Sequence, residues 1–302
     1  MGDRLRALVL GSAAGGGLPQ WNCGCRNCTD ARKVPPEIVP QSQSSLGLSL
    51  NGTDWALLNV SPDIRTQILD NPRLHPKSRR DSPIKSVLLT NGDIDHIAGL
   101  LVLRERQPFT VFLTADIAGI IEQNPVFSVL DRELVTFCVV DIDQPFELLP
   151  GVRAELFSVP GKVALFMEEG EVESDRERGH TVGVRLEAGG ERMWYVPGCA
   201  RLSDDLRKHL QDEALVFFDG TVFENDEMQR VKVGQKTGAR MGHMAMNGPD
   251  GSIAGFADLN VARKIYVHIN NTNPVWQKNS TERRTVEEAG WEIAYDGMEV
   301  VL

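Results

Sequence analysis

Three cysteines stand close together near the amino terminus: Cys23, Cys25 and Cys28. Gly24 lies between the first two and lets one tight turn of backbone aim three sulfur atoms at a common point. Such a cluster suits a soft divalent ion, and tetrahedral zinc needs a fourth ligand, usually a histidine, from elsewhere. A disulfide is disfavoured in a reducing compartment. The cluster therefore predicts a structural zinc site, with free thiols as the alternative.

A second group of ligand-type side chains follows an apolar segment. Residues 86–100 read Ser-Val-Leu-Leu-Thr-Asn-Gly-Asp-Ile-Asp-His-Ile-Ala-Gly-Leu. The first residues predict a buried strand, and α/β folds place their chemistry at strand ends. We therefore expect a site at Asp93, Asp95 and His96. The alternative is that Asp95 caps the next helix and that His96 is a core imidazole.

The elements that must position these groups can be predicted from apolar patterning. Short buried strands are expected at residues 6–10, 55–60, 86–89, 109–114, 154–159, 182–186, 193–196, 215–218 and 264–269. Helical spacing is found at residues 115–123, 203–211 and 281–289, with Ser203 as an N-cap and Gly290 as a helix stop. Strands outnumber helices without strict alternation, which favours a layered α/β sandwich over a doubly wound sheet or a barrel.

The intervening segments contain no repeat and no linker, so we expect one domain over residues 1–302. Three polar stretches, at residues 70–83, 168–179 and 223–252, are predicted to be long surface loops. The acidic part of the second, residues 168–177, is a solvated loop or, alternatively, a lid over a site. The glycine-rich residues 11–17 lack the G-x-G-x-x-G spacing and open no helix, which disfavours a nucleotide site.

Composition and charge exclude several classes of function. The 302 residues include 32 Lys and Arg against 42 Asp and Glu, a formal net charge of −10. Nucleic acid is therefore an unexpected partner, because binding it requires a basic surface. No apolar run approaches the roughly 18 residues of a membrane span, and the short apolar stretch at residues 7–10 does not resemble a secretory signal. We expect a cytoplasmic protein with no membrane partner.

The segment that begins at Thr90 resembles the metallo-β-lactamase superfamily, whose strand end reads T-H-x-H-x-D-H-x-x-G-L. The residues that match are Thr90, Asp95, His96, Gly99 and Leu100. Asn91 and Asp93 stand where that pattern has two histidines. The resemblance implies an αββα sandwich, which is the fold that we predict for this chain.

Within that superfamily the chain is similar to the pyrroloquinoline quinone (PQQ) biosynthesis protein B family along essentially its whole length. The segments that carry the similarity are residues 11–17, 19–23, 219–221, 226–228, 241–243 and 268–274. The resemblance implies iron- and oxygen-dependent hydroxylation of the tyrosine ring in a cross-linked Glu-Tyr precursor of PQQ, a small or short peptide-derived substrate. An older description of the family implies instead a carrier that helps to transport PQQ or its precursor to the periplasm.

The superfamily's two-metal hydrolases use seven ligand positions, which fall here at Asn91, Asp93, Asp95, His96, Gly161, Gly198 and His268. A glycine offers no side-chain ligand, so the resemblance implies that the two-metal site is lost and that a residual hydrolase is the least favoured function. Asp95, His96 and His268 remain. One carboxylate and two imidazoles are the ligand set of non-haem iron(II) oxygenases.

The same resemblance assigns roles to neighbouring residues. His243 is a candidate general base or substrate contact, with an ordinary surface histidine as the alternative. Asp93 and Asp219 are candidates to orient the ligands or to bind the amino groups of the precursor.

The fourth zinc ligand is open. A weaker similarity to the phosphodiesterase family of the carbon–phosphorus lyase pathway places a histidine at the position of Asn271. Asparagine is a poor zinc ligand. His268 is therefore an alternative fourth ligand of zinc, in which case Asp93 or Asp219 would replace it at iron.

Overall fold

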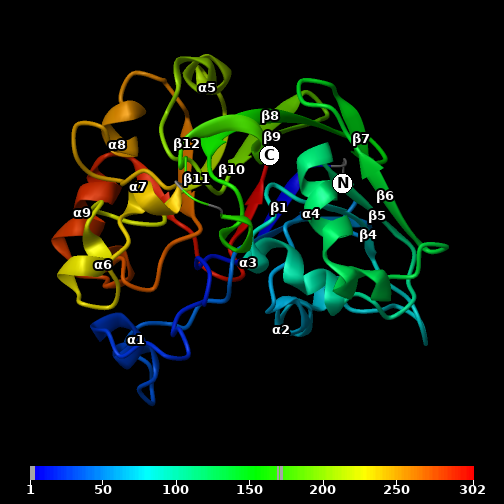
Figure 1. Ribbon diagram of the computed structural model, residues 1–302, viewed down its shortest axis with the longest axis horizontal. Coiled ribbons are helices and arrows are strands. Elements are labelled where there is room, and N and C mark those ends of the chain that lie inside the picture. Colours follow the sequence, from blue (N-terminus) through cyan, green and yellow to red (C-terminus); the bar gives the residue numbers. More distant parts are fainter. Residues whose placement is uncertain (1–3, 169, 171–172) are drawn as a thin grey trace.

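The computed structural model describes residues 4–168, 170 and 173–302. In this part of the chain the strands form two sheets that pack face to face, and helices cover the outer face of each (Figure 1). The predicted αββα sandwich is confirmed.

Each sheet is antiparallel at one end and parallel at the other. Within the described ranges, the first sheet has the order β14 (Glu299–Val301), β1 (Arg6–Gly11), β2 (Ser45–Ser49), β3 (Trp55–Leu58), β4 (Ile84–Leu88), β5 (Phe109–Leu113) and β6 (Val135–Val139). The second has the order β13 (Trp291–Ile293), β12 (Arg263–Val267), β11 (Leu215–Asp219), β10 (Glu191–Val196), β9 (Arg176–Ala188), β8 (Val152–Gly161) and β7 (Phe146–Leu149). Parallel pairing runs from β3 to β6 and from β10 to β13.

The helices divide between the two outer faces. On the first sheet lie α2 (Ile64–Asp70), α3 (Ile94–Ile97) and α4 (Ala115–Gln123), from the centre of Figure 1 toward its right. The other helices lie at the left and top of Figure 1: α1 (Arg26–Ala31), α5 (Asp204–Leu210), α6 (Glu227–Arg230), α7 (Gly238–Met241), α8 (Ser252–Gly255) and α9 (Thr281–Glu288). Short 3₁₀ helices span Pro72–Leu74, Ala98–Leu101, Pro125–Val129, Leu165–Met167 and Pro274–Trp276.

Side chains that alternate between the two faces of each strand build three apolar layers. In β1, Ala7 and Val9 point into the layer between the sheets, while Leu8 and Leu10 point into the layer beneath the helices of the first sheet. Successive strand side chains point to opposite faces, so one buried strand can serve two layers. The apolar runs of the sequence are continuous for this reason.

The sequence predictions and the observed elements agree where patterning is strong. Helix α4 has the predicted bounds, and Ser203 caps α5 by accepting a hydrogen bond from the Leu206 amide at 3.3 Å. Gly290 follows α9 with φ of 76°, as a helix stop requires.

The prediction of a surface loop at residues 223–252 is wrong. This segment contains α6 and α7, and it buries Phe223, Met244 and Met246. Helices of four residues are too short to show a helical period, so their apolar side chains appeared isolated. The stretch 168–179 is also only partly a loop, because β9 begins at Arg176; residues 169, 171 and 172 lie outside the described residues.

No helix in the described ranges has both the length and the apolar character needed to cross a membrane.

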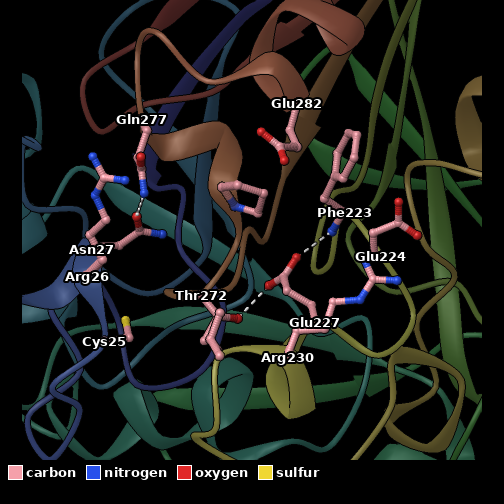
Figure 2. A pocket seen from close by; sticks show the side chains of 12 residues that line it. Cys25, Arg26, Asn27, Phe223, Glu224, Glu227, Arg230, Thr272, Gln277 and Glu282 are labelled. Atoms are coloured by element: carbon pink, nitrogen blue, oxygen red, sulfur yellow. Dashed lines mark hydrogen bonds between the residues drawn. The ribbon is translucent and has the colours of Figure 1, made fainter.

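A buried glutamate fixes the loop that follows β12. Glu227 accepts hydrogen bonds from the Phe223 amide at 2.7 Å and from the Thr272 hydroxyl, and Thr272 in turn accepts one from Asn270 at 2.6 Å. Phe223, Glu227 and Thr272 line a hollow of about 300 Å³, which Figure 2 shows. Cys25 lines the same hollow. Burial raises the pKa of Glu227 to about 7.

The raised pKa of Glu227 predicts a pH dependence of stability. The folded protein holds a proton that the unfolded chain releases above its usual pKa of 4.5, so the free energy of unfolding should fall as pH rises from about 4.5 to about 7. The loss due to this group is about 3 kcal/mol. Urea unfolding of wild type and Glu227→Gln across this range should show a flatter profile in the variant. Parallel profiles would contradict the prediction.

A second prediction concerns Gly99, which follows α3. A β-carbon at this position would lie 2.3 Å from the Ser61 carbonyl oxygen, so Gly99→Ala must push the α3 segment away from β3. The free energy of unfolding should fall by about 2 kcal/mol. Gly119→Ala in α4 is the matched control, because the nearest atom to a β-carbon there is in the flexible side chain of Gln123, at 3.8 Å. This variant should be neutral or stabilising by up to about 1 kcal/mol. Equal effects of the two variants in urea unfolding would contradict this account.

Candidate metal and catalytic site

The candidate metal ligands come from both sheets. Asp95 and His96 lie in α3, directly after β4, whereas His268 follows β12 of the other sheet. Donor atoms of Asp95, His96 and His268 all lie within 4.8 Å of one another. His268 has φ of 55°, a left-handed backbone conformation that is uncommon outside glycine and typical of functional sites. The carboxyl ends of strands from two sheets thus bring together residues that are 172 positions apart, from 96 to 268.

The hydrogen bonding of His96 favours a cation at this point. Its side chain is buried, and neither ring nitrogen has a hydrogen-bond partner in the described part of the chain. Burial lowers the pKa of His96 to about 4, so the imidazole is neutral and can donate a lone pair at neutral pH. Buried polar atoms without a hydrogen-bond partner are rare in native proteins. A metal ion would give one of the two ring nitrogens of His96 a partner.

Asp95 and His268 form a close pair between the two sheets. The His268 Nε2 atom lies 3.1 Å from Asp95 Oδ2. Burial opposes charge on both groups, yet His96 and His268 hold the pKa of Asp95 below its usual value, and Asp95 raises that of His268. A cation bound here would replace the proton on His268.

Thr221 selects the tautomer of His268. Its hydroxyl lies 2.7 Å from Asp219 Oδ1 and 2.9 Å from His268 Nδ1. If the hydroxyl proton goes to the carboxylate, Nδ1 of His268 donates to the Thr221 oxygen, which leaves Nε2 as the ligand atom. Groups of this kind commonly orient metal-binding histidines.

His243 forms a pair with the fully buried Asp219. Its Nδ1 atom lies 2.7 Å from Asp219 Oδ2, and its ring stacks on that of His268 with centroids 5.1 Å apart. Only 16% of the His243 side chain is exposed, so it is not an ordinary surface histidine. With Nδ1–H directed at Asp219, Nε2 is available to accept a proton.

Asp93 borders the same site. Its Oδ1 atom accepts a hydrogen bond from the Leu165 amide at 3.3 Å. Burial, followed by repulsion from Asp95, raises the pKa of Asp93. The Asp93 carboxylate thus feels the charge of Asp95. It is not in the cluster of Asp95, His96 and His268, nor in the second cluster of potential metal ligands, which consists of Asp219, His243 and His268.

Two of the superfamily's ligand positions, Gly161 and Asn91, are taken up by other contacts, and a third, Gly198, offers no side chain. A β-carbon at Gly161 would lie 2.5 Å from Thr181 Oγ1, so Thr181 occupies the space of a side chain there. At Gly198 the nearest atom to such a β-carbon is His243 Cε1 at 3.5 Å. Asn91 accepts a hydrogen bond from the Asp93 amide at 3.0 Å. The first metal position of the hydrolases, which falls at Asn91, Asp93 and Gly161, therefore lacks its histidine ligands, and Thr181 occupies part of its space.

The glycine-rich loop that follows β1 closes one side of the site. Its backbone pairs with the segment after His268, with hydrogen bonds of 2.9 Å from Ala14 to Ile269 and from Ile269 to Ser12. A β-carbon at Gly15 would lie 3.2 Å from Asp95 Oδ2, so glycine allows the close approach. The loop thus supports the candidate metal site, a role that its sequence did not reveal.

The three cysteines gather around Asn271 rather than a histidine. The Asn271 Nδ2 atom lies 3.2 Å from Cys23 Sγ, 3.7 Å from Cys25 Sγ and 3.3 Å from Cys28 Sγ. Asn27 holds the backbone of this loop by donating to the Asn271 carbonyl at 2.9 Å. His268, the alternative fourth ligand of zinc, lies near Asp95 and His96 and is not in the cysteine cluster.

The protonation of the cysteines also suits an ion. Burial raises the pKa of Cys25 to about 12, whereas hydrogen bonds within the cluster lower that of Cys23 against the effect of burial. A soft cation bound by the sulfurs would displace the protons that remain on them. A half-turn of the Asn271 amide would direct Oδ1 toward such an ion.

Sequence reasoning gave no role to Thr221 or to the Asn271 amide. Thr221 belongs to the sequence Asp-Gly-Thr that directly follows the apolar residues of β11. Polar residues at the end of a buried strand were a signal that could have predicted its place in the site. The contact of Asn271 with cysteines more than 240 residues away had no local signal.

The chain is similar to known proteins along its whole length. Residues 54–269 match the model of the β-lactamase superfamily domain. The coenzyme PQQ synthesis protein B of Rhizobium meliloti is 58% identical over 298 residues, which cover 99% of this chain and 98% of that protein. The protein of the same name from Ruegeria pomeroyi is 52% identical and covers 99% of this chain and 100% of its own length.

Solved structures give the same result. The crystal structure of zinc-bound PqqB from Methylobacterium extorquens matches with a TM-score of 0.97 and 50% identity, covering 98% of this chain and 100% of that chain. A diphosphatase of the PhnP family shares the fold, with a TM-score of 0.70 at 18% identity over 99% of this chain and 97% of that chain. The expected family is confirmed: the chain belongs to the coenzyme PQQ synthesis protein B family of the β-lactamase superfamily.

Proposed function

We propose that this chain acts in PQQ biosynthesis as an iron- and oxygen-dependent hydroxylase of the tyrosine ring in a cross-linked Glu-Tyr precursor. Asp95, His96 and His268 would hold Fe(II), and the cysteine cluster would hold a structural zinc ion. The proposal rests above all on the two imidazoles and one carboxylate whose donor atoms lie within 4.8 Å. Such a set leaves coordination positions open for dioxygen and substrate.

The metal-site geometry argues against a hydrolase. A two-metal clamp needs ligands for a second ion, and glycine occupies positions 161 and 198. Thr181 also fills the space of a side chain at position 161. Hydrolysis by two ions is therefore the function that the site supports least.

The reaction would convert an aromatic C–H bond to C–OH. Fe(II) bound to the triad would supply activation of dioxygen. One oxygen atom enters the ring and the other leaves as water, so each turnover consumes two electrons and two protons from an external small-molecule reductant. The ring must lie beside the triad while bulk water stays out.

The other polar residues would handle protons and position the substrate. Asp219 holds His243 through Nδ1, so that Nε2 faces the substrate side and can accept the phenolic proton. Thr221 fixes His268 through its other ring nitrogen. Asp93, a buried carboxylate at the edge of the site, would attract an amino group of the precursor.

The central test is loss of turnover on removal of one ligand. Wild type loaded anaerobically with Fe(II), then given oxygen, ascorbate and the precursor, should form a product that is heavier by one oxygen atom in mass spectrometry. His96→Ala should lose bound iron and turnover, whereas His75→Ala, which alters a half-buried histidine outside the candidate site, should keep both. An unchanged precursor with wild type would contradict the proposal. Tight precursor binding that survives His96→Ala would then favour a carrier.

His243→Gln tests proton transfer separately from metal binding. The variant should keep its iron, because His243 is not in the Asp95 cluster, and it should lose about 10²-fold in kcat, the low end for a general base. The limb of the wild-type pH–rate profile that reports the base should disappear. A normal kcat with an unaltered pH profile would remove His243 from the mechanism.

A further inference from the structure

Two cations converge on one carboxylate beside the metal site. Lys162 Nζ lies 3.1 Å from Glu168 Oε1, and the guanidinium of Arg240 binds the same carboxylate with both of its terminal nitrogens, at 3.2 and 2.8 Å. The side chains of Lys162 and Glu168 are each 11% exposed, while that of Arg240 is 40% exposed and so reachable from solvent. Arg240 and Lys162 lower the pKa of Glu168 to about 2.

These cations are carried by the segments that build the site. Lys162 directly follows Gly161, one of the lost ligand positions, and Arg240 precedes His243 by three residues. The two segments touch, since a β-carbon at Gly242 would lie 3.1 Å from Lys162 Cγ. The Lys162 charge also acts on the Asp93 carboxylate. The cationic pair therefore stands at the edge of the space that a substrate of His243 and Asp93 would enter.

Glu168 reaches this pair from the segment that borders the site. The preceding 3₁₀ helix, Leu165–Met167, touches the site through the Leu165 amide on Asp93, and its Leu165 and Phe166 side chains are largely exposed. Glu168 satisfies two cations that would otherwise be costly to leave unpaired when partly buried. A carboxylate of a ligand could take its place without any other change in charge.

We propose that Lys162 and Arg240 form a carboxylate-binding subsite, in which Glu168 stands in for a carboxylate of the incoming substrate. This inference rests on the proposed function, because a cross-linked Glu-Tyr precursor carries several carboxylates. Asp93, Asp95 and Asp219 repel such a ligand, and the cationic pair offsets that repulsion at one end. Arg and carboxylate match in bidentate geometry, which also orients the ring.

The direction in which each variant changes ligand affinity separates a binding subsite from ion pairs that only stabilise the structure, which we call a structural latch. Arg240→Gln, Lys162→Met and Glu168→Gln all break the same ion pairs, so a latch predicts effects in one direction. A subsite predicts opposite directions: Arg240→Gln and Lys162→Met lose a partner of the substrate, whereas Glu168→Gln removes its competitor. Calorimetry with anaerobic, iron-loaded protein and the synthetic precursor should show binding about tenfold weaker in the first two and several-fold tighter in the third.

Two controls make the result specific. The precursor with its α-carboxylates converted to methyl amides should bind wild type and Arg240→Gln about equally. Arg263→Gln breaks a comparable bidentate pair with Glu292 away from the site and should bind like wild type. Shifts of the same sign in Arg240→Gln and Glu168→Gln, or equal sensitivity of the blocked ligand, would overturn the subsite.

A second probe separates this inference from the proposed function. Glutarate carries two carboxylates and no phenol, so its weak binding, followed by NMR, should show the same opposite signs in the three variants. That pattern in glutarate, with no binding of the precursor to wild type, would overturn the proposed function and support the subsite. If wild type hydroxylates the precursor but the variants shift the affinity for both ligands in one direction, the proposed function is supported and the subsite is overturned.

Discussion

The carboxylate of Asp219 is fully buried at the end of β11, where it accepts hydrogen bonds from three separate segments. The donors are the Cys199 amide at 2.9 Å, the Thr221 amide at 3.0 Å, the Thr221 hydroxyl at 2.7 Å and His243 Nδ1 at 2.7 Å. Burial alone would raise the pKa of Asp219, but His243 and these hydrogen bonds keep it below its usual value. A buried charge without such partners would be costly, so each donor is held in place by the same requirement.

Both imidazoles on this side of the site depend on that carboxylate. His243 is bound directly, and His268 is bound through the hydroxyl of Thr221. The orientations of the two rings are thereby held by hydrogen bonds within the protein, which is the preorganisation that catalytic groups need. Asp95 and His96 approach from the other sheet, so the packing of the two sheets decides the spacing of the triad.

Where this chain departs from the superfamily's ligand pattern, it loses ligand atoms, and other side chains also occupy part of the space. Thr181 packs against Gly161, and the Asn91 side chain turns to its own loop. A second ion would therefore need these side chains to move, in addition to regaining its ligands. Among the superfamily's ligand positions, Asp95, His96 and His268 keep side chains whose donor atoms lie close enough together to bind one metal ion.

Local pattern revealed the parts of the fold and site that depend on short segments. The cysteine turn, the Asp95–His96 pair, α4 and the cap at Ser203 are each encoded within a few residues, and so the sequence alone predicted them. Strand β2 was missed because it reads Ser-Leu-Gly-Leu-Ser, whose serines are satisfied by long-range contacts such as Ser45 with the Asn59 carbonyl. Other strands, such as β13, are too short to show a pattern.

Contacts between distant segments were beyond local pattern. The place of Asn271 among the cysteines and the convergence of Lys162 and Arg240 on Glu168 each join parts of the chain that only the packed sandwich brings together. The role of the glycine-rich loop also depends on where β1 lies relative to α3. Chemistry-bearing residues could be listed from the sequence, but their partners required the fold.

Anomalous diffraction from crystals grown with Fe(II) and Zn(II), recorded at both absorption edges, tests the central claim most directly. The account predicts an iron peak bounded by Asp95, His96 and His268, and a separate zinc peak among Cys23, Cys25 and Cys28. Iron among the sulfurs, or no iron beside His268, would contradict it.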